Sequence, residues 1–142
     1  MKISARNQFP GTVSDVHTGA VYTEVDVRLR GGTPLVAMIT KESAETLGIK
    51  PGVEVIALVK APQILIVTDF GGYRISARNQ LPGNIVQMKP GAINTEIVIE
   101  LNGGEMVTAT VTNDSVETLG LRLGQPATAV FKSSAVILAV AA

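Results

Sequence analysis

The residues that could bind a small ligand are hydrogen-bond donors, and they form three groups that each occur twice in the chain. The first group is the segment Ser-Ala-Arg-Asn-Gln, at residues 4–8 and again at residues 76–80. The second is a threonine followed three positions later by a serine, and the third is a lysine near the end of each half. The candidates are Ser4, Ala5, Arg6, Thr40, Ser43, Lys60, Ser76, Ala77, Arg78, Thr112, Ser115 and Lys132.

Hydroxyls, a guanidinium, an ammonium and free backbone N–H groups together suit a compact oxyanion. Arginine offers donors in a fixed fork, lysine offers a point charge, and a helix N-terminus adds unpaired N–H groups. Phosphate at neutral pH keeps a proton that needs an acceptor, which a site made mainly of donors lacks. The donor set therefore favours a fully ionised tetrahedral dianion such as molybdate, tungstate or sulfate.

Each group also has a structural interpretation, which the sequence leaves open. The threonines and serines could be ordinary helix caps. The lysines could belong to turns, the arginines to structural ion pairs, and the Asn-Gln pairs to the fastening of a strand end. Duplication copies structural residues as well, so their repetition does not decide between these interpretations.

Other chemistry has little support in the residues present. The chain has no cysteine and a single histidine, His17, so thiolate and histidine-cluster metal sites are excluded. It has no nucleophile elbow and no P-loop. The carboxylates Asp15 and Asp26 align with Gln87 and Val98 in the second half, so no acid pair is shared by both halves. We expect no enzymatic activity, no cofactor and no bare metal ion.

Composition limits the partners. Twelve basic and twelve acidic residues cancel, and only two tyrosines and three phenylalanines are present. A nucleic-acid binder would usually show a basic excess and aromatic stacking platforms, so an OB-type module for nucleic acid or protein interaction is the second hypothesis. No apolar run approaches the ~18 residues of a membrane span and no signal-peptide pattern is present, so we expect a cytoplasmic protein without a membrane partner.

The chain is an internal duplication. A shift of 72 residues aligns residues 3–68 with residues 75–140 without a gap, with about 25 identities. We therefore expect two domains, at residues 1–70 and 71–142. Two copies are too few for a solenoid.

Each unit has the pattern of a small β-barrel. Apolar residues alternate with polar ones over residues 21–29 and 93–101, which indicates strands with one buried face. A Gly-Gly pair after each run predicts a hairpin, and a Thr start with a Gly end predicts a short helix at residues 40–48 and 112–120. The resulting order is three strands, a helix and two strands. We predict an all-β protein with two tandem five-stranded OB folds, whose long first strands bend at Gly11 and Gly83.

Four motifs resemble one known family. They are ISARNQ-x-PG, GA-[VI]-x-TE-[VI], T-x-x-S-x-E-TLG and a lysine before the last strand, and all four occur in both units. Together they are similar to the molbindin, or Mop, domain, and the match covers essentially the whole chain. The combination is more specific than SARNQ alone.

The resemblance implies a function and an assembly. Mop domains have OB folds and assemble as six units, so a two-unit chain would be a homotrimer. They bind molybdate or tungstate at interfaces between units without chemical turnover, in intracellular molybdenum storage and homeostasis. No residues outside the two units are left for a helix-turn-helix, so we expect no nucleic-acid partner.

The resemblance also implies two classes of site. One class combines the SARNQ segment and the lysine of one unit with the helix start of another. In this chain the sets are Ser4, Ala5, Arg6 and Lys60 with Thr112 and Ser115, or Ser76, Ala77, Arg78, Lys132 and Ser133 with Thr40 and Ser43. For the second class, near a three-fold axis, the candidates are Gly19, Ala20, Gly91 and Ala92.

One position departs from the family pattern. A serine often follows the lysine; Ser133 fits, whereas the first unit has Ala61 and then Pro62. Loss of one hydroxyl donor costs about 1 kcal/mol. We therefore expect the two sets of sites to differ in affinity.

Overall fold

The computed structural model describes residues 1–142, and the two halves of the chain have the same order of elements. The first half contains β1 (Asn7–Thr18), β2 (Tyr22–Leu29), β3 (Pro34–Thr40), α1 (Lys41–Thr46), β4 (Glu54–Val59), the 3-10 turn η1 (Ala61–Gln63) and β5 (Leu65–Val67). The second half contains β6 (Asn79–Pro90), β7 (Asn94–Leu101), β8 (Met106–Thr112), α2 (Asn113–Leu119), β9 (Pro126–Phe131), η2 (Ser133–Ala135) and β10 (Ile137–Ala139). Neither helix has the length and apolar character needed to cross a membrane.

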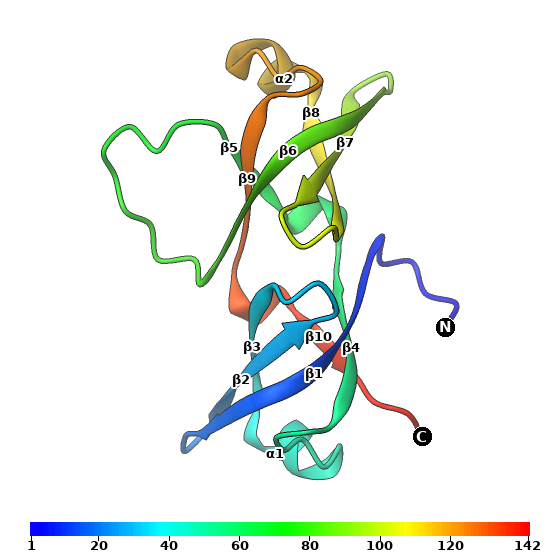
Figure 1. The fold of residues 1–142 in the computed structure, drawn as a ribbon, viewed down its shortest axis with the longest axis vertical. Coiled ribbons are helices and arrows are strands. Elements are labelled where there is room, and N and C mark those ends of the chain that lie inside the picture. The colour runs from blue at the N-terminus through cyan, green and yellow to red at the C-terminus, as the bar shows by residue number, and fades with distance from the viewer.

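These elements form two curled five-stranded sheets in which all strand pairs are antiparallel. The sheets are stacked along the long axis of the molecule, with α1 at one end and α2 at the other (Figure 1). The predicted all-β class, with one short helix between the third and fourth strand of each unit, is confirmed. We call the region where the two sheets meet, around Arg6–Asn7 and Arg78–Asn79, the waist.

The alternating sequence pattern produces the buried face of each sheet. In β2 the side chains of Thr23, Val25, Val27 and Leu29 are buried, while the residues between them are more exposed. A single hydrophobic core of 27 buried residues includes side chains from both halves. The two sheets therefore share one core across the waist.

The long first strand of each half pairs with two neighbouring strands. In β1, Gly11 pairs with Leu29 of β2 on one side and with Val55 of β4 on the other. A Cβ atom on Gly11 would lie 2.7 Å from the carbonyl oxygen of Arg28. The glycine therefore allows the neighbouring strand to come close where β1 curls around the sheet, as the sequence predicts.

The fifth strands are exchanged between the halves, which sequence analysis did not predict. The strand orders are β10-β4-β1-β2-β3 and β5-β9-β6-β7-β8, so each sheet takes its last strand from the other half. After β4 the chain makes only the 3-10 turn η1, which packs against β8, and continues into the second sheet. A direct return to β4 would need a reversal, whereas this short turn lets Ile64 and Ile66 fill the core at the waist.

Two buried asparagines add hydrogen bonds across the waist. The side-chain amide of Asn7 donates to the Thr108 carbonyl at 2.8 Å, and its oxygen accepts from the Thr108 N–H at 2.7 Å. Asn79 makes the same two bonds with Val36, each at 2.8 Å. The side-chain amide of Asn7 thus pairs with the edge strand β8 as a residue of a neighbouring strand would, and that of Asn79 pairs with β3 in the same way. Of the interpretations that the sequence leaves open for these residues, the fastening of a strand end is present, and it joins the two halves.

Replacement of Asn7 by alanine should destabilise the protein, because it leaves the partly buried N–H and carbonyl groups of Thr108 without partners. We expect the free energy of unfolding to fall by about 1–3 kcal/mol, measured by urea unfolding. The matched control is Asn102→Ala, since Asn102 lies exposed in the β7–β8 turn with no side-chain hydrogen bond. Equal losses for the two variants would contradict the role given to Asn7.

Candidate oxyanion-binding site

The arginines and lysines of the predicted site lie together at the waist. Asn7 pairs with Val59 at the end of the β1–β4 ladder, so Arg6 and Lys60 flank this pair on neighbouring chain segments. Asn79 pairs with Phe131 in the same way, which places Arg78 beside Lys132. Neither lysine forms an ion pair within the chain. Each copy therefore presents an arginine and an unpaired ammonium side by side.

Free backbone donors accompany these cations. The N–H groups of Ser4, Ala5 and Arg6 donate no hydrogen bond within the chain, and neither do those of the equivalent residues 76–78. Ala5 is buried all the same, with 8% of its surface exposed. Successive backbone N–H groups without a partner can bind an anion, so this segment is suited to one that would accept from it.

Both arginines are engaged with a glutamate of the other half. The Nη1 and Nη2 atoms of Arg6 lie 2.6 and 2.9 Å from the two carboxylate oxygens of Glu96. Arg78 donates one hydrogen bond to Glu24, from Nη1 to Oε2 at 3.0 Å, and its Nη2 lies 3.0 Å from Oε1 in the same ion pair. Of the two interpretations left open by the sequence, the structural ion pair is present. The pair uses at most two of the five guanidinium N–H groups, so at least three donors remain on each arginine.

The threonines and serines cap the two helices. The Thr40 hydroxyl oxygen accepts from the Ser43 N–H at 3.1 Å and donates to the Ser43 hydroxyl at 2.8 Å, and Thr112 and Ser115 have the same geometry. The predicted cap is confirmed. The cap requires only the threonine oxygen, so the serine hydroxyl protons are left to donate elsewhere.

The chain does not bring these two groups of donors together. Val36 lies at the waist, bonded to Asn79, and Thr40 is four residues further along β3. Four residues of strand span roughly 13 Å. The helix starts therefore point away from the waist, toward the two ends of the molecule in Figure 1. A site that uses both groups needs a helix start from another chain.

The glycines and alanines predicted near a three-fold axis lie in turns. Gly19 and Gly91 occupy the turns before β2 and β7, where their N–H groups donate to Tyr22 and Asn94 carbonyls at 2.8 Å. The tight turn explains each glycine, because a Cβ atom at Gly19 would lie 2.7 Å from the Tyr22 oxygen. Ala20 and Ala92 are exposed beside them. A ligand role for these four residues stays a prediction.

Sequence analysis missed two features near the site. The glutamates of the Thr-Glu motif, Glu24 and Glu96, were not singled out, although the motif occurs in both halves. His17, expected in a surface loop, lies in β1 and contacts Asp15 and Asp26 at 3.3 and 3.6 Å. The second half lacks this cluster, in which both aspartates contact His17.

Comparison with known proteins identifies the family. The sequence model of the TOBE domain matches residues 3–66 and again residues 75–138. The chain belongs to the TOBE-domain family. The two TOBE units resemble, as a pair, a solved structure of the cytoplasmic molybdate-binding protein ModG with molybdate bound. That match has 51% identity and a TM-score of 0.96, and it covers 99% of this chain and 100% of that chain.

Curated relatives match nearly the whole of this chain. The molybdenum transport protein ModE of Herbaspirillum seropedicae is 45% identical over 140 residues, and the molybdenum-pterin-binding protein MopA of Rhodobacter capsulatus is 44% identical over 140 residues. Each match covers 99% of this chain but only 52% and 53% of the relative. The chain therefore spans about half the length of these relatives. The resemblance to the molbindin, or Mop, family is confirmed.

At the start of α2, the Thr112 hydroxyl caps the helix, whereas the Ser115 hydroxyl is not needed for the cap. Replacement of Thr112 by valine removes the cap acceptor and should lower the free energy of unfolding by about 1 kcal/mol. Replacement of Ser115 by alanine keeps the backbone N–H that Thr112 accepts, so a much smaller loss is expected. Chemical unfolding of both variants measures this difference. A Ser115→Ala variant as unstable as Thr112→Val would show that the serine hydroxyl belongs to the cap.

Proposed function

We propose that the protein binds molybdate, or tungstate as its close analogue, without transforming it, and so stores or buffers the anion in the cytoplasm. The observation that carries this proposal is the pair of donor clusters at the waist, each with unpaired backbone N–H groups beside an arginine and a free lysine. The relative at 51% identity, whose structure holds molybdate, supports the choice of anion.

The chemistry of the cluster favours binding over catalysis. Its groups are donors and cations, and the carboxylate that pairs with each arginine is already occupied by that arginine. Such a set stabilises a fully ionised oxyanion through charge-assisted hydrogen bonds. It contains no nucleophile activated by a base and no group placed to shuttle a proton, so we propose no enzymatic step.

The proposed sites are shared between chains. The waist supplies Ser4, Ala5, Arg6 and Lys60, or Ser76, Ala77, Arg78, Lys132 and Ser133, and the helix start of a neighbouring chain supplies Thr112 and Ser115, or Thr40 and Ser43. We propose a homotrimer with six TOBE units as the assembly that joins them. An anion held between chains stabilises the assembly, because it binds the assembled state more tightly than the separated chains.

A mixing experiment tests both the anion and the sharing. Lys60→Ala/Lys132→Ala removes two lysines that form no ion pair, and Ser43→Ala/Ser115→Ala removes hydroxyls that the caps do not need. The wild type should melt at a higher temperature in millimolar molybdate, and each double variant alone should lose this shift. Variants unfolded and refolded together should regain binding, at roughly one site in four for random assembly of shared sites.

The results of the mixing experiment distinguish a failure of the proposed function from a failure of the proposed sharing of sites. A wild-type melting temperature that millimolar molybdate and tungstate leave unchanged contradicts the proposed function. Binding by the wild type without recovery in the mixture contradicts the sharing of sites between chains. The mass in solution, measured on the wild type and on each variant alone, confirms that both variants still assemble.

The two sets of sites should differ because Ser133 has no counterpart hydroxyl at Ala61. Isothermal titration of the wild type should resolve two classes of sites, separated by about 1 kcal/mol, or roughly fivefold in affinity. Ser133→Ala should weaken the tighter class and merge the two. Ser134→Ala, one residue further along η2, is the control and should leave both classes unchanged. A single homogeneous class in the wild type would contradict the difference.

A further inference from the structure

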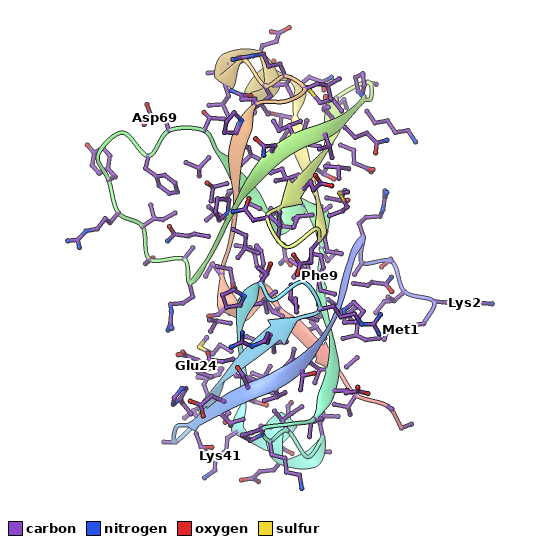
Figure 2. All side chains as sticks on the ribbon, in the orientation of Figure 1. Met1, Lys2, Phe9, Glu24, Lys41 and Asp69 are labelled. Atoms are coloured by element: carbon purple, nitrogen blue, oxygen red, sulfur yellow. The ribbon has the colours of Figure 1, made fainter.

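The ion pairs at the waist join a predicted anion ligand to a carboxylate of the opposite half. Arg6 belongs to the first half and Glu96 to the second, whereas Arg78 and Glu24 are arranged the other way round. Figure 2 shows Glu24 on the lower sheet, on the side where the segment between β5 and β6 returns to β6. Glu24 lies in β2, between β1 and β3, and Glu96 lies in β7, between β6 and β8. The backbone of each glutamate is therefore held by strand pairing on both sides.

Stability does not account for these pairs. The arginine side chains are 57% and 53% exposed, and exposed ion pairs contribute little to folding. The next residue in each case, Asn7 or Asn79, already joins the halves through buried hydrogen bonds. The pairs therefore have another consequence, which is to fix the orientation of the guanidinium.

A two-pronged contact fixes the plane of a guanidinium as well as its position. The glutamates are less exposed than the arginines, at 23% for Glu96 and 33% for Glu24, so each carboxylate lies against its sheet while the guanidinium extends outward. The three N–H groups that remain on each arginine then have fixed directions before any anion arrives. The carboxylate also offsets one charge, so each cluster of arginine, lysine and glutamate carries one net positive charge.

We propose that Glu24 and Glu96 are positioning residues that set the anion selectivity of the binding sites, each acting from the opposite half of the chain. This inference rests on the proposed function. Donors held at fixed points match one size of tetrahedral anion, because a preformed site avoids the cost of ordering its groups only for a ligand that fits. A guanidinium free to rotate would adapt to the larger molybdate and the smaller sulfate alike.

The test compares two anions in variants of the same strand. Glu96→Gln removes the charge, and Glu96→Asp keeps the charge but shortens the reach by one methylene. Both should lower the ratio of molybdate to sulfate affinity by about tenfold at the sites that contain Arg6, measured by titration calorimetry and by sulfate competition. Glu24→Gln should do the same at the sites that contain Arg78. The control is Glu100→Gln, since Glu100 is an exposed glutamate of β7 without an ion pair.

The possible results separate the two proposals. A wild type that binds no molybdate refutes the proposed function. A wild type that binds molybdate, with a selectivity ratio unchanged in Glu96→Gln or Glu96→Asp, overturns the positioning role alone. Equal weakening of molybdate and sulfate also overturns it, because a merely structural effect would lower both affinities together. The melting temperature without anion should stay within a few degrees of the wild type for every variant.

Discussion

The exchange of β5 and β10 is the constraint on which the rest of the structure depends. Each sheet is completed by a strand from the other half, and the short turns η1 and η2 carry the chain across the waist. Lys60 and Lys132 are the residues at which these crossings begin. The crossing that builds the shared core therefore also places a lysine beside each arginine. The shared core and the proposed anion site therefore both depend on this topology.

The fusion of two units in one chain has allowed their contacts to diverge. At the waist Glu105 accepts hydrogen bonds from the Gly31 N–H at 3.1 Å and from the Thr33 hydroxyl at 2.7 Å. Thr33 and Glu105 are equivalent positions of the two copies. Two identical units would place like residues there, and two glutamates would repel each other. In this chain the second copy instead supplies an acceptor, Glu105, and the first copy supplies the donors, Gly31 and Thr33.

The sequence predicts each unit better than it predicts the relation between units. The alternation in β2 and β7, the glycines of β1 and β6, and the threonine caps are local patterns, and all appear in the structure as expected. The exchange could not be predicted, because the fifth strands of the two copies are similar enough to complete either sheet. The Arg6–Glu96 pair was missed for a related reason. Both residues stand in recognised motifs, but their contact joins different copies and depends on the packing at the waist.

The positions retained in both copies have two kinds of explanation. Asn7, Arg6 and Glu24 and their equivalents make reciprocal contacts across the waist, so contacts within the single chain account for their retention: the asparagines join the two halves and the ion pairs orient the arginines. The serines at the helix starts have no such contact. Around them Lys41, Glu42 and Ala44 have become Asn113, Asp114 and Val116, while Ser43 and Ser115 are unchanged. The threonine oxygen suffices for the cap, and the helix starts lie away from the waist. No contact within the single chain therefore explains why both serines are retained, whereas the proposed sharing of sites between chains would explain it.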